Sequence, residues 1–75
     1  MNGGRTLPRY YVNMNAQANG DHEVRRADNC PTPANEANRQ YLGTFDSCHQ
    51  AVVEAQKVYA QSNGCANCSP ACHTS

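Results

Sequence analysis

The C-terminal stretch of the sequence concentrates side chains that can bind a metal ion. Cys65, Cys68 and Cys72 lie close together there and His73 follows them. A pair of cysteines separated by two residues is half of a typical structural zinc site, because this spacer lets both sulfurs approach one ion at about 2.3 Å. Cys30, far upstream, can supply a thiolate from another part of the chain. The sequence therefore predicts a zinc ion bound by Cys30, Cys65, Cys68 and Cys72.

The fourth ligand is the least specified member of this set. His73 and His22 compete with Cys72 for that position. Asp21 and Glu23 flank His22, but in a strand these neighbours point to the face opposite the imidazole. We therefore expect His22 to lie at a solvated hairpin tip rather than in a second metal site.

Disulfides are the alternative use of the cysteines. Five cysteines can form two bridges and leave one thiol unpaired, with a connectivity that the sequence leaves open. The first residues carry no apolar run resembling a secretory signal. We therefore expect a cytoplasmic protein with reduced thiols, which favours zinc over a disulfide-stapled domain.

The sequence favours a non-catalytic protein. Redox-active C-x2-C motifs sit at helix N-termini, whereas Cys65 follows the end of an expected helix. Cys48 is either a small buried residue or a thiol activated by a helix N-terminus beside His49. Adjacent helical side chains diverge by about 100°, so Cys48 and His49 make a poor dyad. A nuclease of the compact hairpin–helix metal type needs a His base and an Asn or His metal ligand in that unit, and the helix carries only His49.

Composition limits both the core and the partners. A chain of 75 residues with one Phe and no Trp buries too little apolar surface to be stable without a staple. Zero net charge argues against strong non-specific nucleic-acid binding and against a membrane surface. Nor is there an apolar run long enough for a membrane span. The expected partner is another protein, with nucleic acid as a weak alternative. Four of the arginines could form a basic patch if the expected strands are neighbours, although an ordinary solvated face is the simpler interpretation. These are Arg9, Arg25, Arg26 and Arg39.

The N-terminal half predicts a small antiparallel sheet. Residues 1–8 are expected to be a flexible arm, and residues 9–75 a single domain. Residues 9–14 are rich in aromatic and β-branched types and predict a strand. Asn19-Gly20 predicts a tight turn into a second strand at 21–26, with Val24 facing inward. A loop rich in Pro and Asn spans 27–38, and residues 39–43 predict a third strand.

The C-terminal half predicts one helix. Ser47 and Gln50 form a capping-box pattern, and we expect the helix to continue until Asn63-Gly64, with Gly64 in the left-handed conformation. Apolar residues recur at helical spacing along one face: Ala51, Val52, Ala55, Val58 and Tyr59. The predicted fold is α+β, a hairpin and a short third strand packed on one helix and stapled by the C-terminal cysteines.

The order of these features resembles two groups of proteins. It resembles the small zinc-binding domain of Ada-type DNA-repair methyltransferases and its relatives appended to bacterial nucleases. It is also similar to short free-standing bacterial proteins that carry NGDHEV, YLG, a helix beginning near Ser-Cys, and a terminal NGC-x2-C. The resemblance covers about residues 10–73. It implies a zinc ligand at the position of Arg26, where the appended domains commonly have histidine, so here that role passes to Cys72 or His73.

The function expected from the sequence is a small, non-catalytic zinc-binding interaction module. One alternative is a phage- or mobile-element-type inhibitor or regulator of an enzyme that processes nucleic acid. The second alternative is a disulfide-stapled domain.

Overall fold

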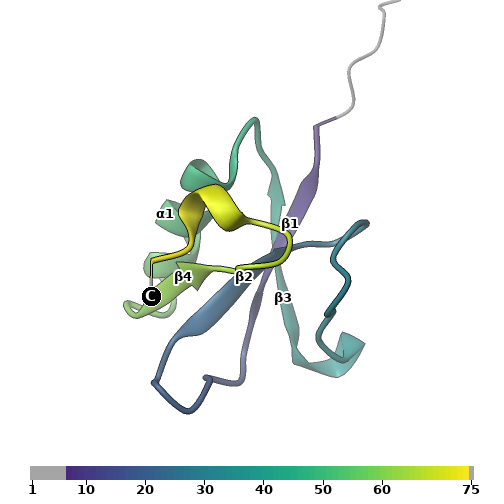
Figure 1. Ribbon diagram of the computed structural model, residues 1–75. Helices are drawn as coiled ribbons and strands as arrows, with labels where there is room; N and C mark the ends of the chain where they lie inside the picture. Colours follow the sequence, from purple (N-terminus) through teal and green to yellow (C-terminus); the bar gives the residue numbers. More distant parts are fainter. Residues whose placement is uncertain (1–6, 75) are drawn as a thin grey trace, which may run out of the picture.

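The computed structural model describes residues 7–74, so the expected arm lies outside the described residues except for Leu7 and Pro8. The elements in chain order are β1 (Arg9–Asn13), β2 (His22–Arg26), the short 3-10 helix η1 (Glu36–Asn38), β3 (Arg39–Thr44), α1 (Cys48–Gln56), β4 (Ser62–Gly64) and the 3-10 helix η2 (Pro70–Cys72). Helix α1 and the C-terminal segment lie on the same side of the sheet (Figure 1).

The sheet has the strand order β3-β1-β2-β4. The central strand β1 pairs antiparallel with both β2 and β3, and the turn between β1 and β2 places Gly20 at a φ of 93°. These features confirm the predicted hairpin, third strand and α+β class. Strand β4 was not predicted, and it runs parallel to β2, which makes the sheet mixed.

The core lies between α1 and one face of the sheet. Tyr10, Val12 and Val24 meet Ala51 and Ala55 there, all of them buried. This confirms Val24 as the inward residue of β2 and the alanines as the inner face of the helix. The layer is thin because the helix contributes mostly small side chains, so cross-links must add to its stability.

Tyr11 is buried on the opposite face of the sheet. Its hydroxyl accepts a hydrogen bond from the backbone N–H of Ala34 at 3.0 Å. The guanidinium of Arg39 lies 4.6 Å from the centre of its ring, and Tyr41 packs edge-on against it. The loop between β2 and β3 therefore folds over this face, which positions the cysteine that the loop carries.

Helix α1 is shorter than the sequence predicted. It ends at Gln56, and the next backbone hydrogen bonds tighten: Lys57 N–H reaches the carbonyl of Glu54, and Val58 N–H that of Ala55. Tyr59 then stacks on His22 with ring centres 4.0 Å apart. The chain then extends into β4, which pairs with the edge of β2. This pairing satisfies backbone groups along that edge, which a longer helix would leave without partners from the chain.

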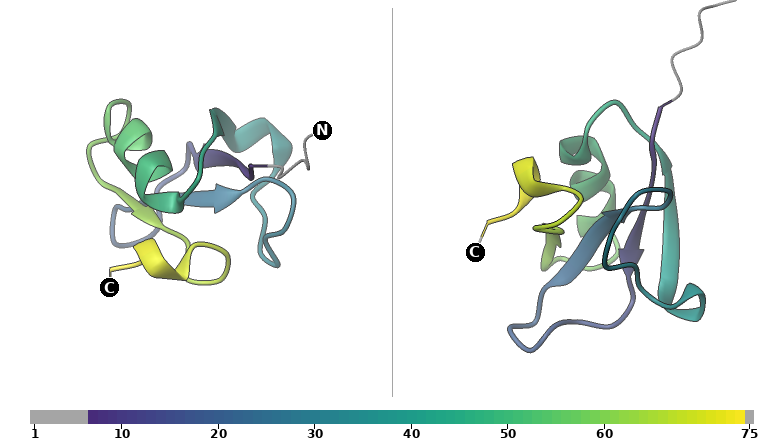
Figure 2. Two further views of the ribbon diagram at one scale, coloured as in Figure 1. Left: turned by 90° about the horizontal axis from the view of Figure 1, so that it is seen from above. Right: turned by 45° about the vertical axis from the view of Figure 1, so that its right-hand side comes forward.

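Gly64 serves close packing rather than a helix cap. The expectation of a left-handed conformation was wrong, because the described residues with positive φ are Gly20 and Gly43. A Cβ on Gly64 would lie 2.6 Å from the Cβ of Cys72 and 2.8 Å from the carbonyl oxygen of Ser69. The C-terminal segment thus folds directly onto β4 and α1, as both views in Figure 2 show. No helix within residues 7–74 is long and apolar enough to cross a bilayer.

Candidate metal centre

Three cysteine sulfurs converge at the end of β4. The Sγ atoms of Cys30, Cys65 and Cys68 all lie within 4.8 Å of one another. Those of Cys30 and Cys65, from positions 35 residues apart, are separated by 3.8 Å. Cys65 is buried, and the other two are partly exposed. The structure therefore brings together three of the four residues predicted as zinc ligands.

Backbone geometry explains how the C-x2-C pair is presented. The N–H of Cys65 donates to the carbonyl of Val24 at 2.9 Å, which continues the parallel pairing of β4 with β2. The N–H of Ser69 then returns to the carbonyl of Cys65 at 2.8 Å. This tight turn brings Cys68 back beside Cys65, where its sulfur accepts a hydrogen bond from the N–H of Arg26 at 3.3 Å.

Arg25 is the charged group closest to the sulfurs. Its Nη1 lies 3.0 Å from Sγ of Cys65 and 3.6 Å from Sγ of Cys30. The same nitrogen donates to the carbonyl and the hydroxyl of Thr32, and Nη2 pairs with the buried carboxylate of Glu23. The guanidinium is thereby fixed, and its hydrogen bond and positive charge favour the thiolate form of Cys30.

The pKa values of two of the thiols are shifted in opposite directions in the metal-free protein. Burial raises the pKa of Cys30, but hydrogen bonds from Cys68, from the backbone at Thr32 and from Arg25 outweigh it and lower that pKa to about 7. Burial and the hydrogen bond to Cys30 raise the pKa of Cys68 to about 12, against the effect of the Arg26 N–H. Of these two thiols, Cys30 therefore forms its thiolate first.

Cys72 is not part of this group. It forms a disulfide with Cys48 at the start of α1, 24 residues away in sequence. The prediction of Cys72 as a ligand is corrected here, because its side chain points to the helix and not to the three sulfurs. Cys48 is buried, as one interpretation of it expected, and its bond to Cys72 belongs to the disulfide alternative, which left the connectivity open. Zinc and disulfides were weighed as alternatives, whereas the described residues hold one bridge beside three free thiols.

The competing histidines are engaged elsewhere. Nδ1 of His22 is 2.9 Å from the carbonyl oxygen of Asn13, and its ring stacks on Tyr59. Nδ1 of His73 is 3.0 Å from the carbonyl oxygen of Gly64. Neither belongs to the three-sulfur group. His22 therefore has a packing role rather than the solvated position that was expected.

Arg25 and Thr32 are the site residues that sequence reasoning missed. Arg25 was expected on a solvated face with three other arginines, but its side chain is only 11% exposed. Strand alternation gave a signal, because it places Glu23 and Arg25 on one face of β2 as a charge pair. No sequence rule connects that face to cysteines 40 residues later.

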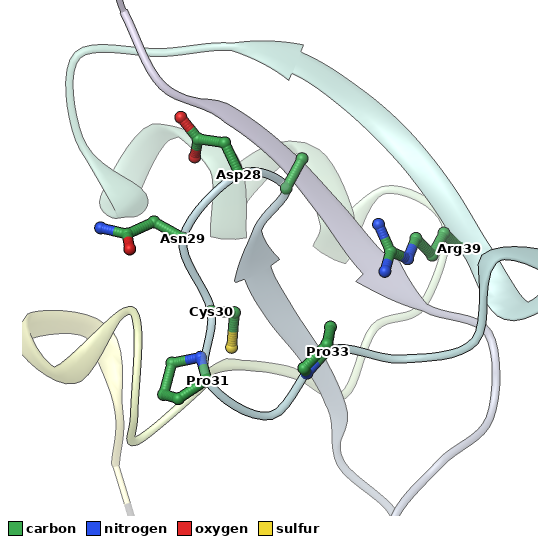
Figure 3. Close-up of a pocket in the computed structure, with 7 residues that line it drawn as sticks. Asp28, Asn29, Cys30, Pro31, Pro33 and Arg39 are labelled. Carbon is green, nitrogen blue, oxygen red and sulfur yellow. The ribbon is translucent and has the colours of Figure 1, made fainter.

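A shallow pocket adjoins the metal centre. It has a volume of about 530 Å³ and is lined by the loop after β2 and by Arg39 at the start of β3. Figure 3 shows the sulfur of Cys30 on the inner side of this loop, with Pro31 and Pro33 beside it. Binding of an ion by Cys30 would therefore fix one wall of the pocket.

Comparisons with models of protein families, with curated proteins and with solved structures found no match to this chain.

Proposed function

We propose that this chain is a small non-catalytic zinc-binding module whose ion is held by Cys30, Cys65 and Cys68. The observation that carries the proposal is the 3.8 Å separation of the Cys30 and Cys65 sulfurs. Two sulfurs bound tetrahedrally to one zinc at about 2.3 Å are themselves about 3.8 Å apart. A disulfide would need about 2.0 Å. The thiols are thus spaced for a shared ion.

The electrostatic surroundings support the same assignment. A zinc ion with three thiolates carries a net negative charge, which is costly to bury without compensation. Arg25 donates to two of the sulfurs, and the N–H of Arg26 donates to the third. Such donors orient metal-bound thiolates and lower the cost of their charge.

The ion would close the fold where the apolar core is thinnest. It would join the loop after β2 to the turn that follows β4, two segments on which no part of the core cluster falls. Structural zinc contributes roughly 10–16 kcal/mol of apparent binding energy in zinc-finger peptides. The Cys48–Cys72 bridge closes a span of 24 residues, worth about 3 kcal/mol by chain entropy. Zinc would therefore be the larger of the two staples.

The module would recognise another protein through the pocket beside the ion. Asp28 and Arg39 give this surface one charge of each sign, which suits a polar peptide segment better than a phosphate backbone. The proline residues stiffen the loop, so little conformational entropy is lost when a partner binds. Zinc would act here by holding Cys30 and with it the wall of the pocket.

Metal analysis of the purified protein tests the zinc site. We expect about one zinc per chain, and three thiols that react only after chelation and denaturation. Cys30→Ser, Cys65→Ser and Cys68→Ser should each lose the metal. The matched control is the double variant Cys48→Ala/Cys72→Ala, which removes two cysteines outside the group and should keep it. Equal metal loss in the control, or a metal-free wild type, would refute the site.

Capture experiments test the interaction role. Tagged zinc-loaded protein should retain a protein partner from lysate after nuclease treatment. The substitution Asp28→Ala should weaken that capture while leaving the zinc content unchanged, because the exposed side chain of Asp28 lines the pocket and is not a ligand. Loss of the captured material on nuclease treatment would instead identify nucleic acid as the partner.

A further inference from the structure

The three-thiol group lacks a fourth ligand from the chain. Within residues 7–74, the group of metal-binding side chains at this position contains Cys30, Cys65 and Cys68 and no other Cys, His, Asp or Glu. Structural zinc sites have four protein ligands, whereas sites with three keep one position for an exchangeable ligand. On the basis of the proposed zinc site, we propose that its fourth position is open and binds a small soft monoanion from solution, such as a low-molecular-weight thiolate.

The polar groups nearest the sulfurs are suited to a bound anion rather than to coordination. Arg25 has only donor hydrogens and cannot bind a cation. The hydroxyl oxygen of Thr32 lies 3.7 Å from Sγ of Cys30 and 4.0 Å from Sγ of Cys65, close to the about 3.8 Å between neighbouring ligands of a tetrahedral zinc. Thr32 therefore borders the sulfurs of Cys30 and Cys65, on a side from which a fourth ligand could approach the ion.

Hydrogen bonding turns the Thr32 hydroxyl proton toward the sulfurs of Cys30 and Cys65, the side of the group where a bound ion and its ligand would lie. The hydroxyl oxygen accepts from Nη1 of Arg25 at 2.9 Å and from Nδ2 of Asn67 at 3.0 Å. These two donors occupy both lone pairs, so the hydroxyl can act only as a donor in its remaining bond. A guanidinium and a hydroxyl proton on one side of the ion favour a negatively charged ligand over a neutral one.

The choice of a soft ligand follows from the zinc itself. Three thiolates already donate strongly to the ion, and soft donors suit such a site. The site is also accessible, because Thr32 is exposed, Cys30 is partly exposed, and the open pocket of about 530 Å³ adjoins Cys30. A water molecule bound there would be readily exchanged for a small anion.

Cobalt(II) in place of zinc makes the fourth ligand visible through its d–d absorption. We would titrate the Co(II)-loaded full-length protein with thiocyanate, a soft monoanion that leaves the Cys48–Cys72 bridge intact. The expected result is a saturable shift of the d–d bands at one thiocyanate per metal. The control is Thr32→Cys, which places a fourth thiol beside the group and should abolish the response.

The outcomes separate this inference from the zinc site. Co(II) binding with bands that do not respond to thiocyanate would overturn the open position and leave the metal site standing. Failure of the wild type to bind Co(II) or zinc would overturn both. An unchanged response in Thr32→Cys, with its metal content retained, would show that Thr32 does not border the fourth position and would refute the geometry argued here.

Discussion

Substitution of Gly64 by alanine should damage both the fold and the metal centre. The added Cβ would lie 2.6 Å from the Cβ of Cys72, and 2.8 Å from both the carbonyl carbon of Cys72 and the carbonyl oxygen of Ser69. Ordinary van der Waals contact begins at 3.4 Å, so all three distances are too short. The atoms that the new Cβ would overlap belong to the backbone or to a disulfide-bonded side chain. These atoms cannot move aside as a flexible side chain can.

The expected cost follows from that rigidity. Overpacking of a well-filled interior typically costs about 1–3 kcal/mol, and we expect about 3 kcal/mol because η2 must shift as a unit. Cys65 follows Gly64 directly and Cys68 lies in the turn before η2. The shift should therefore also weaken zinc binding, by at least about tenfold, or ~1.4 kcal/mol.

Urea unfolding and chelator competition measure the two effects, and Gly43→Ala is the matched control. Gly43 has a φ of 120° but room for a Cβ, whose nearest neighbour would be a Phe45 ring carbon at 3.8 Å. The control should lose roughly 1–3 kcal/mol of unfolding free energy from backbone strain. Its zinc affinity should be unchanged under conditions in which the protein is fully folded. A Gly64→Ala protein with wild-type stability and wild-type affinity would refute the close packing of the C-terminal segment on β4.

Three further predictions follow from individual residues. Arg25→Ala should weaken zinc binding by at least about tenfold, because Nη1 of Arg25 lies 3.0 Å from Sγ of Cys65 and 3.6 Å from Sγ of Cys30; dye competition would detect the loss, and unchanged affinity would show that the guanidinium does not support the metal-bound thiolates. In chelated, metal-free protein at neutral pH, iodoacetamide should label Cys30 before Cys68, because their pKa values are about 7 and about 12; peptide mapping that shows the reverse order would contradict the hydrogen-bond assignment. Hydrogen bonds from Gln61 and Asn63 lower the pKa of Asp21 below its ordinary value of 3.8. The ionised carboxylate therefore stabilises the fold above pH 3.8, and this contribution is lost as the pH falls through the lower folded pKa. Asp21→Asn should flatten the acid branch of a plot of urea midpoint against pH, and identical acid branches in the two proteins would contradict this role of Asp21.

Local patterns accounted for three of the four strands and for the C-x2-C pair of the metal centre. The alternation in residues 9–14 and the Asn19-Gly20 turn predicted the hairpin because both signals act between near neighbours. The C-x2-C pair was equally local, and a two-residue spacer allows few arrangements. These features require no knowledge of where the rest of the chain lies.

The errors involved competition between distant segments. Residues 57–64 carry a helical pattern, yet their pairing with the open edge of β2 was available only once the hairpin existed. The partner of Cys72 was open among several cysteines, and its choice depended on η2 packing against α1 over Gly64. Arg25 looked like a surface charge because its environment is created by cysteines that follow it by 40 positions.

With the proposed zinc bound, the segment after β4 would be fastened at two places by bonds that respond oppositely to the redox state of the surroundings. A reducing environment opens the Cys48–Cys72 bridge but preserves thiolates for an ion at Cys65 and Cys68. An oxidant attacks exposed thiolates and expels the ion, yet it leaves the bridge in place. With the proposed zinc bound, transfer of the protein between such environments would remove one fastening at a time, and the C-terminal segment would remain attached to the domain in either.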